Sequence, residues 1–438
     1  MHNPSSDAPI PLKSDAPSDI PSATLSGTGA HDAPAASPMV RWLDADDQPQ
    51  QAVWRSLAGH APFERVVLVD DATPADDAYR MARAGTGLLW VGDYQNARHL
   101  LQALGRRLKA RIDGRRVAKP DGAAPALPAL GSPAMAEAFA AQRREQNERT
   151  RILGALLLPF DADHGVPLRR APDVREAGLE AHGVVKEPYV ASLRELQGVI
   201  GAHEWRKTGV PVAALKDNIY PHHGVFSPVR GEYVDLVART KLPAAAKPAR
   251  ALELGCGSGV LCAVLARRGL WVVATDVSPA ALACSEDNLT RLELKERVTL
   301  LPQSLYPKGR FGLVVCNPPW VPGPAGSALD GAVYDPDSRM LRGFLDGLAA
   351  HLAPGGEGWL ILSDLAEHLG LRSREELLGW ISAAGLQVLG RTETPPVHAR
   401  ASDAADPLHR ARAAEMTSLW RLGRAEAPAA TAPTPALS

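Results

Sequence analysis

The chain has 438 residues, too many for one ordinary domain, so its length predicts two or three domains. Its 48 Lys and Arg against 49 Asp and Glu give a formal net charge of -1, which excludes a global field towards nucleic acid or anionic lipid. The 4 cysteines lack metal-ligand spacing, and no apolar run reaches the roughly 20 residues of a membrane helix. We therefore expect a soluble, cytoplasmic protein without a resident metal or a membrane contact.

The two ends of the chain differ in composition from the rest. Residues 1–38 and 425–438 are rich in Ala, Pro, Ser or Thr and have few large apolar side chains, so both segments are predicted to be disordered. The residues from 39 to 200 predict a separate N-terminal accessory domain of the α/β or α+β type, with strands at 66–69, 88–91 and 152–160 and helices at 76–84, 95–112 and 135–150. Residues 201–250 then form a connecting segment and hinge.

Residues 251–424 alternate between apolar runs of strand length and helical patterns. Strands are predicted at 251–254, 271–275, 298–301, 311–316, 358–362, 386–391 and 416–422, and helices at 260–268, 279–292, 340–352 and 374–384. This alternation is typical of an α/β domain with a doubly wound, mostly parallel sheet, here of seven strands. In such a sheet, ligands bind in the crevice at the carboxyl ends of the strands.

A glycine-rich turn joins the first of these strands to its helix. A sharp strand-to-helix turn needs residues without a Cβ atom where the backbone approaches a ligand, and three alternating glycines meet that need. A nicotinamide-binding turn requires a further glycine at position 260, where the chain has Val260, so the spacing disfavours that cofactor. An aspartate ends the next strand, where doubly wound folds place a carboxylate for ribose hydroxyls. The candidate cofactor residues here are Glu253, Gly255, Gly257, Gly259 and Asp276.

Asn317, Pro318, Pro319 and Trp320 follow the predicted strand at 311–316. The side-chain oxygen of Asn317 and the backbone carbonyl of Pro318 are two hydrogen-bond acceptors that the prolines hold rigidly. Such a pair suits a planar exocyclic or amide nitrogen, because accepting hydrogen bonds from both of its N–H groups makes the nitrogen more pyramidal and more nucleophilic. Trp320 offers a ring that can stack on the planar group. We expect these four residues to be catalytic.

In this order, the motifs at 253–259 and 317–320 resemble those of class I S-adenosylmethionine (SAM) methyltransferases of the small-domain type. The resemblance implies a Rossmann-like methyltransferase sheet, SAM as the cofactor, and methylation of a nitrogen with Asn317 beside the transferable methyl group and no metal. It implies that Glu253 lies near the amino-acid end of the cofactor and that Ser304, after the third strand, is a candidate for the adenine. It also implies that the strand at 416–422 is inserted antiparallel in the sheet.

Two substrate classes stay open, both macromolecular. Small-domain methyltransferases that modify ribosomal RNA bases often have a large N-terminal domain, as this chain does, and we place a nucleic acid slightly ahead on that ground. Protein-glutamine N5-methyltransferases of the release-factor type also carry the motif, and Phe226, Arg230 and Glu232 resemble the segment that precedes their catalytic domain. A basic segment suits either phosphate contacts or a solvated helix end, and it comprises Arg106, Arg107, Lys109, Arg111, Arg115, Arg116 and Lys119.

Two alternatives belong to other classes of protein, a nicotinamide-dependent oxidoreductase and a non-catalytic SAM-binding module. His222 and His223 are adjacent in a loop, where surface or capping roles are more common than catalysis. Cys316 is expected to be a small buried apolar side chain rather than a nucleophile. The sequence does not predict the oligomeric state.

Overall fold

The computed structural model describes residues 37–117, 128–228, 231–247, 250–325, 330–396 and 406–425. From residue 38 onwards these residues belong to one compact unit that contains two large sheets. None of the helices in these ranges combines the length and the hydropathy of a membrane span. The predicted disordered ends, residues 1–38 and 425–438, fall almost entirely outside the described residues.

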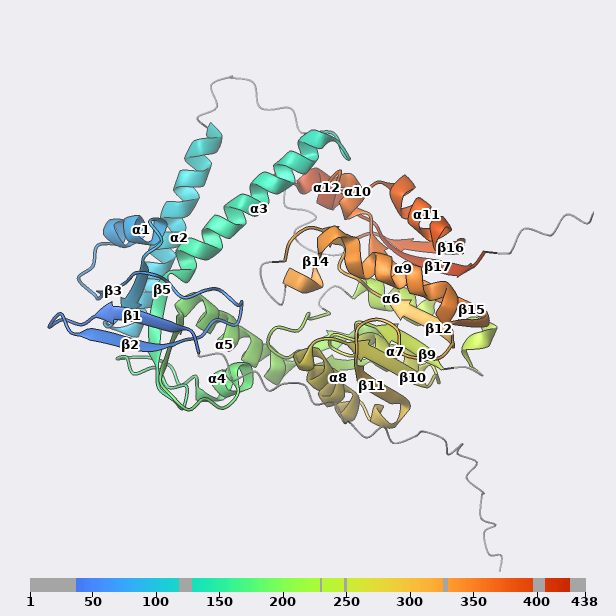
Figure 1. The fold of residues 1–438 in the computed structure, drawn as a ribbon, viewed down its shortest axis with the longest axis horizontal. Coiled ribbons are helices and arrows are strands. Elements are labelled where there is room, and N and C mark those ends of the chain that lie inside the picture. Colours follow the sequence, from blue (N-terminus) through green and yellow to red (C-terminus); the bar gives the residue numbers. More distant parts are fainter. Residues whose placement is uncertain are drawn as a thin grey trace, which may run out of the picture. The chain divides into compact units, whose positions relative to one another are not determined.

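The first sheet has six strands in the order β1-β2-β6-β5-β4-β3 (Figure 1). Strands β3, β4 and β5 are parallel, whereas β6 is antiparallel to β5, and β1 and β2 pair as an antiparallel hairpin. The strands are β1 Met39–Leu43, β2 Pro49–Trp54, β3 Val66–Val69, β4 Gly87–Trp90, β5 Leu156–Phe160 and β6 Tyr189–Ser192. The helices are α1 Ala75–Arg83, α2 Tyr94–Val117, α3 Pro133–Gly154, α4 Arg175–His182 and α5 Leu193–Thr208.

One predicted boundary in this region is wrong. The strand expected at 152–160 begins only at Leu156, because helix α3 continues through Gly154. Ile152 and Leu153 are buried on the last turn of that helix, so the apolar run joins a buried helix end to a buried strand. Periodicity cannot separate two such segments when they are short and adjacent.

The second sheet has seven strands in the order β11-β10-β9-β12-β15-β17-β16, and β17 is antiparallel to both of its neighbours. The strands are β9 Ala251–Leu254, β10 Val272–Asp276, β11 Val298–Pro302, β12 Phe311–Cys316, β15 Leu352–Ser363, β16 Leu386–Thr394 and β17 Thr417–Arg424. The helices after β9 are α7 Val260–Arg267, α8 Pro279–Arg291, α9 Arg339–His351, α10 Leu365–His368, α11 Arg374–Ala383 and α12 His409–Ala413. The α/β class and the antiparallel insertion of the last strand are therefore confirmed.

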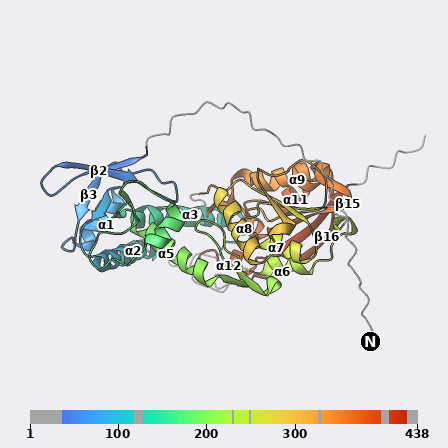
Figure 2. The same cartoon turned by 90° about the horizontal axis from the view of Figure 1, so that it is seen from below.

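Helices cover both faces of the second sheet (Figures 1 and 2). Helix α6, Glu232–Arg239, packs with α7 and with Leu289 of α8 against one face, and α9 and α11 pack against the other. Six residues of α7, from Leu261 to Ala266, are buried, as an apolar helix between a sheet and another helix requires. All six residues of β12 are also buried, which fixes the register of the strand that leads to Asn317.

Shorter strands connect these parts. Two pair antiparallel between the sheets, β7 Val210–Val212 and β8 Asp217–Ile219. Two more pair parallel after β12, β13 Val321–Pro322 and β14 Tyr334–Asp335. Strand β15 starts six residues before the predicted 358–362, because residues 352–357 continue the strand beside Phe311 with a register shift instead of forming a loop.

Candidate active site

The two sequence motifs meet at one edge of the second sheet. Strands β9 and β12 are adjacent and parallel, and Leu254 is paired with Cys316. The next residues along each strand, Gly255 and Asn317, therefore leave the sheet side by side. This junction is where the strand order reverses direction in the sheet, and it lies where doubly wound folds bind ligands.

The glycine turn has a left-handed backbone at all three glycines, with φ of 76° at Gly255, 52° at Gly257 and 78° at Gly259. A side chain at any of them would be strained. A Cβ atom at Gly255 would lie 2.7 Å from Cε of Met340, so that position is closed by packing. A Cβ at Gly257 would meet no atom within 4 Å. The turn thus presents bare backbone to open space, as a cradle for a ligand requires.

Asp276 is tied directly to this turn. The backbone N–H of Gly257 donates to its Oδ2 at 3.1 Å, and that of Ser278 donates to its Oδ1 at 2.9 Å. The neighbouring Val277 leaves 73% of its surface exposed. A fixed carboxylate beside an open apolar side chain suits a nucleoside, whose ribose needs acceptors and whose base needs a flat apolar contact.

Ser304 follows β11, and the residues on both sides of it are bonded to the end of β10. The N–H of Gln303 donates to the backbone oxygen of Asp276 at 3.1 Å, and Thr275 donates from its hydroxyl to the backbone oxygen of Leu305 at 2.8 Å. Ser304 is exposed between these two anchors, and Leu305 has a left-handed φ of 54°. The predicted cofactor residues from Gly255 to Ser304 are therefore brought together around one turn.

Glu253 is more deeply buried than its predicted role requires. Its side chain is 2% exposed, and Cys262 of helix α7 donates its S–H to Oε2 at 2.5 Å. Burial raises the pKa of Glu253 to about 8, and the nearby Asp276 adds to the rise, against the Cys262 hydrogen bond. With nothing bound, the carboxyl group is mostly protonated at neutral pH. A cation beside it would favour the carboxylate form.

The catalytic motif contains a contact that the sequence did not predict. The indole N–H of Trp320 donates to Oδ1 of Asn317 at 2.8 Å. Trp320 is half-buried and packs against three clusters of core side chains, so its ring is held in place by the core. A carbonyl oxygen has two lone pairs, so Asn317 can accept one further hydrogen bond. The residue type at position 320 could have indicated this contact, because tryptophan has a ring N–H that can donate to Asn317, whereas phenylalanine and tyrosine have none.

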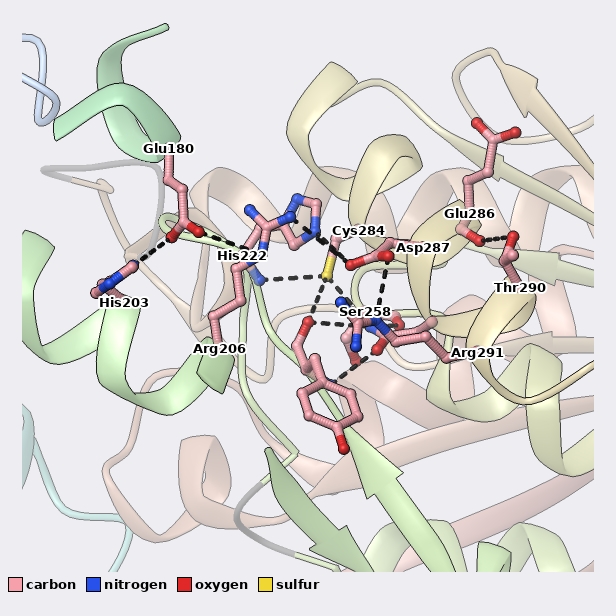
Figure 3. A network of polar contacts seen from close by, with 12 residues as sticks. Glu180, His203, Arg206, His222, Ser258, Cys284, Glu286, Asp287, Thr290 and Arg291 are labelled. Carbon is pink, nitrogen blue, oxygen red and sulfur yellow. Dashed lines mark hydrogen bonds and ion pairs between the residues drawn. The ribbon is translucent and has the colours of Figure 1, made fainter. Parts of the chain in front are cut away.

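A polar network joins the connecting segment to the glycine turn (Figure 3). Buried Asn288 of α8 accepts from the N–H of Tyr220 at 2.8 Å and donates to the backbone oxygens of Tyr220 at 3.3 Å and Ser258 at 3.1 Å. The N–H of His222 donates to Sγ of Cys284 at 3.3 Å. Asn288 thus links Tyr220 to the turn, and no motif in the sequence predicted this role of Asn288.

The network continues towards the helices of the first sheet, as Figure 3 shows. Asp287 of α8 lies 3.3 Å from Nε2 of His222 and 3.8 Å from the guanidinium of Arg206 on α5. Arg206 in turn lies 3.9 Å from Glu180 of α4. Burial lowers the pKa of His222, which Asp287 opposes. The ring of His222 thus has a structural partner in Asp287.

The predicted substrate residues are divided. Phe226 is half-buried beside Ser227, whereas Arg230 lies outside the described residues. Glu232 begins α6 and lines a cavity of about 750 Å³ between that helix and β16. None of the motif residues at 253–259 or 317–320 lines this cavity.

Three side chains of the basic segment have acidic partners. Arg107 lies 2.6 Å from Asp76, Lys109 lies 2.5 Å from Asp113, and Arg111 pairs with Glu148. Arg106 is exposed, the side chains of Arg115 and Arg116 are not among the described ones, and Lys119 lies outside the described residues. Cys316 is buried and burial raises its pKa, as expected of an inert thiol.

Comparisons with known proteins agree with these motifs. A family model described as "Methyltransferase small domain" matches residues 217–374. The release factor glutamine methyltransferase of Geobacter sulfurreducens is 30% identical over 224 residues, which cover 48% of this chain and 69% of that protein. The ribosomal RNA small subunit methyltransferase C of Alcanivorax borkumensis is 32% identical over 120 residues, or 26% of this chain and 32% of that protein. A second release factor glutamine methyltransferase, from Moorella thermoacetica, is 37% identical over 115 residues, or 25% of this chain and 41% of that protein.

Proposed function

The chain belongs to the small-domain methyltransferases, which use SAM as the methyl donor, and we propose that it methylates the amide nitrogen of a glutamine side chain in a protein. Transfer to a nitrogen follows from the family, and the glutamine is our inference. We also interpret the seven-stranded sheet as the doubly wound catalytic domain, over residues 251–424, with residues 39–200 as an accessory domain and 201–250 as the hinge.

One observation carries this proposal: Cys316 is paired with Leu254, so Asn317 and the glycine turn begin at neighbouring ends of two adjacent parallel strands. SAM supplies an electrophilic methyl group on a sulfonium. Asn317 Oδ1 and the Pro318 carbonyl would accept hydrogen bonds from the two N–H groups of the substrate amide and orient its nitrogen towards that methyl group. Pro319 keeps the backbone rigid, and Trp320 holds the Asn317 side chain through the 2.8 Å hydrogen bond.

The cofactor residues fit the same proposal. The backbone of Gly255, Gly257 and Gly259 would lie against the donor, Asp276 would accept from its ribose hydroxyls, and Ser304 would border its adenine. Glu253 would face the ammonium at the amino-acid end. The open space at Gly257 and the exposed Val277 support this arrangement, because both leave room beside the fixed carboxylate of Asp276.

Glutamine is favoured over an RNA base for two reasons. The relative of which this chain covers 69% is named a release factor glutamine methyltransferase, and three cations of the basic segment are engaged by acids. An RNA base remains the second candidate because a ribosomal RNA methyltransferase is also similar. Membership of the family argues against a nicotinamide-dependent oxidoreductase. Methyl transfer by the purified protein would distinguish an enzyme from a non-catalytic SAM-binding module.

The test is transfer of tritiated methyl from SAM to a purified bacterial release factor and, separately, to ribosomal RNA. We expect label in the protein that protease removes and nuclease does not. Asn317→Ala should keep SAM affinity and lower kcat at least about 100-fold. Trp320→Phe removes only the indole N–H and should lower kcat about tenfold. Label in RNA alone would exclude the glutamine proposal, and full activity of Asn317→Ala would exclude the proposed role of its oxygen.

A further inference from the structure

A pair of short strands follows the Asn317–Trp320 motif. It starts at Val321, the residue after Trp320, and β13 pairs with β14 through Val321 and Tyr334. At the end of β14 the carboxylate of Asp335 accepts from N–H groups that open α9: Met340 donates to Oδ1 at 3.1 Å and to Oδ2 at 3.0 Å, and Leu341 donates to Oδ2 at 3.1 Å. The strand pair therefore links the motif to the start of a core helix.

Helix α3, which belongs to the first sheet's part of the chain, contacts this strand pair and residues between its strands through one arginine. The guanidinium carbon of Arg143 lies 3.9 Å from the ring centroid of Tyr334. Its Nη2 donates to the backbone oxygen of Pro324 at 3.1 Å and lies 3.5 Å from Oδ2 of Asp330. The side chain is only 17% exposed, so these contacts are partly shielded from water.

An apolar contact continues from α3 to the motif itself. Met135, on the first turn of α3, is buried in one cluster with Val321 and Leu369, and Trp320 packs against the same cluster. The ring of Phe139, one turn further along α3, has its centroid 6.4 Å from that of Tyr334. Side chains of α3 thus support the residues on which the Trp320 ring rests, and Trp320 in turn holds Asn317.

We infer that Arg143 is a positioning residue for the methyl-acceptor site, acting through the β13–β14 strand pair on Trp320 and Asn317. The inference rests on the proposed function for its consequence in catalysis, but its structural part stands on the contacts alone. The partners of Arg143 are Pro324, Asp330 and Tyr334, which all follow the Asn317–Trp320 motif in the chain. Its loss should disturb the acceptor side of the site and leave SAM binding unchanged. The accessory region would then contribute directly to catalytic geometry.

The chain offers a matched control one residue away. The side chain of Arg144 is 66% exposed, and it forms an ion pair with Glu137 on the same helix, at 2.7 Å. Hydrogen exchange measured by mass spectrometry on peptides covering residues 317–325 should be about tenfold faster in Arg143→Ala, because a cation–π contact and a charged hydrogen bond are lost. Arg144→Ala should exchange as the wild type does. Both variants should bind SAM within about twofold of the wild-type Kd, because the contacts of Arg143 are with residues that follow the Asn317–Trp320 motif and not with the glycine turn.

A second variant changes Tyr334, the partner of Arg143 in the cation–π contact. Tyr334→Leu removes the aromatic face and should also speed exchange in residues 317–325, and the double variant with Arg143→Ala should show less than the sum of the two effects. With a purified bacterial release factor as acceptor, Arg143→Ala should raise KM or lower kcat about tenfold while Arg144→Ala does neither.

The outcomes separate the inference from the proposed function. Unchanged exchange at residues 317–325 in both Arg143→Ala and Tyr334→Leu would overturn the inference, as would equally faster exchange in β4 and β5, which would mean general destabilisation. A wild-type protein that methylates no release factor, with exchange still faster in Arg143→Ala, would reject the glutamine substrate and keep the positioning role.

Discussion

At the scale of single residues, we expect Glu253 to couple the binding of SAM to the release of a proton. Burial raises its pKa to about 8, so the free protein holds a proton on this carboxyl group at pH 7. An ammonium placed beside it would stabilise the carboxylate and expel that proton. We predict that SAM binding at pH 7 releases about one proton. Calorimetric titration in phosphate and in Tris, two buffers with different ionisation enthalpies, measures this release directly.

Glu253→Gln is the matched variant, because glutamine has the shape of the protonated side chain. The folded protein holds more protons than the unfolded chain between pH 4.5 and about 8, so the wild-type free energy of unfolding falls as pH rises through this window. The variant lacks this loss and should have the higher Tm at pH 8.5, with little difference near pH 5. It should also bind SAM more weakly and release no proton. Equal proton release by the variant would assign the titration to another group.

At the scale of elements, Asn288 connects helix α8 to the residue after β8 and to the glycine turn by hydrogen bonds. Its carboxamide bonds the backbone of Tyr220 after β8 and that of Ser258 in the glycine turn, from a buried position on α8. Asn288→Ala removes the hydrogen bonds to the Tyr220 N–H and to the Tyr220 and Ser258 oxygens, so we expect a loss of about 2–4 kcal/mol in the free energy of unfolding. Weaker SAM binding should accompany it, because the turn loses its anchor. Urea unfolding with and without SAM measures both effects.

Thr290, on the same helix, is the control for this prediction. Its hydroxyl donates to the backbone oxygen of Glu286 on an exposed face (Figure 3). Thr290→Ala should change the free energy of unfolding by less than about 0.5 kcal/mol. If the two alanine variants unfold alike and bind SAM alike, the Asn288 carboxamide does not hold the turn.

Local signals explain which elements could be predicted from the sequence. Helix α8 begins at Pro279 after Ser278, whose hydroxyl accepts from the N–H of Ala281, and α11 begins with a capping box between Ser373 and Glu376. Strand β12 is one uninterrupted apolar run. These features involve only a few neighbouring residues, so they can be recognised directly in the sequence. The end of α3 was missed because a buried helix end adjoins a buried strand, and the length of β15 because its first residues pair beside Phe311 across a register shift.

Contacts between distant parts of the chain could not be predicted in the same way. Asn288 bonds a residue 68 positions earlier, and Arg143 bonds one 181 positions later. Neither residue stands in a motif, and each acquires its role only when the sheets have formed. The Trp320 contact with Asn317 spans three positions and could have been proposed from the residue type alone.

At the scale of the whole molecule, charge argues against a phosphate-rich acceptor. The formal net charge is -1, and Arg107, Lys109 and Arg111 of the basic segment are engaged by acids of the same region. A nucleic acid that used these cations would first have to break their ion pairs. A protein acceptor needs no such exchange, because its recognition does not depend on counterion release.

This difference predicts a weak effect of salt on the reaction. Methylation of a release factor should slow less than about threefold between roughly 50 and 200 mM KCl, whereas an acceptor held by 6–10 phosphate contacts would lose about 10³–10⁵ in affinity over that range. Asp76→Asn provides the control, because it frees Arg107 from its 2.6 Å partner. The variant should bind RNA fragments more tightly and methylate the release factor at the wild-type rate. A steep fall of wild-type activity with salt would instead favour an RNA acceptor.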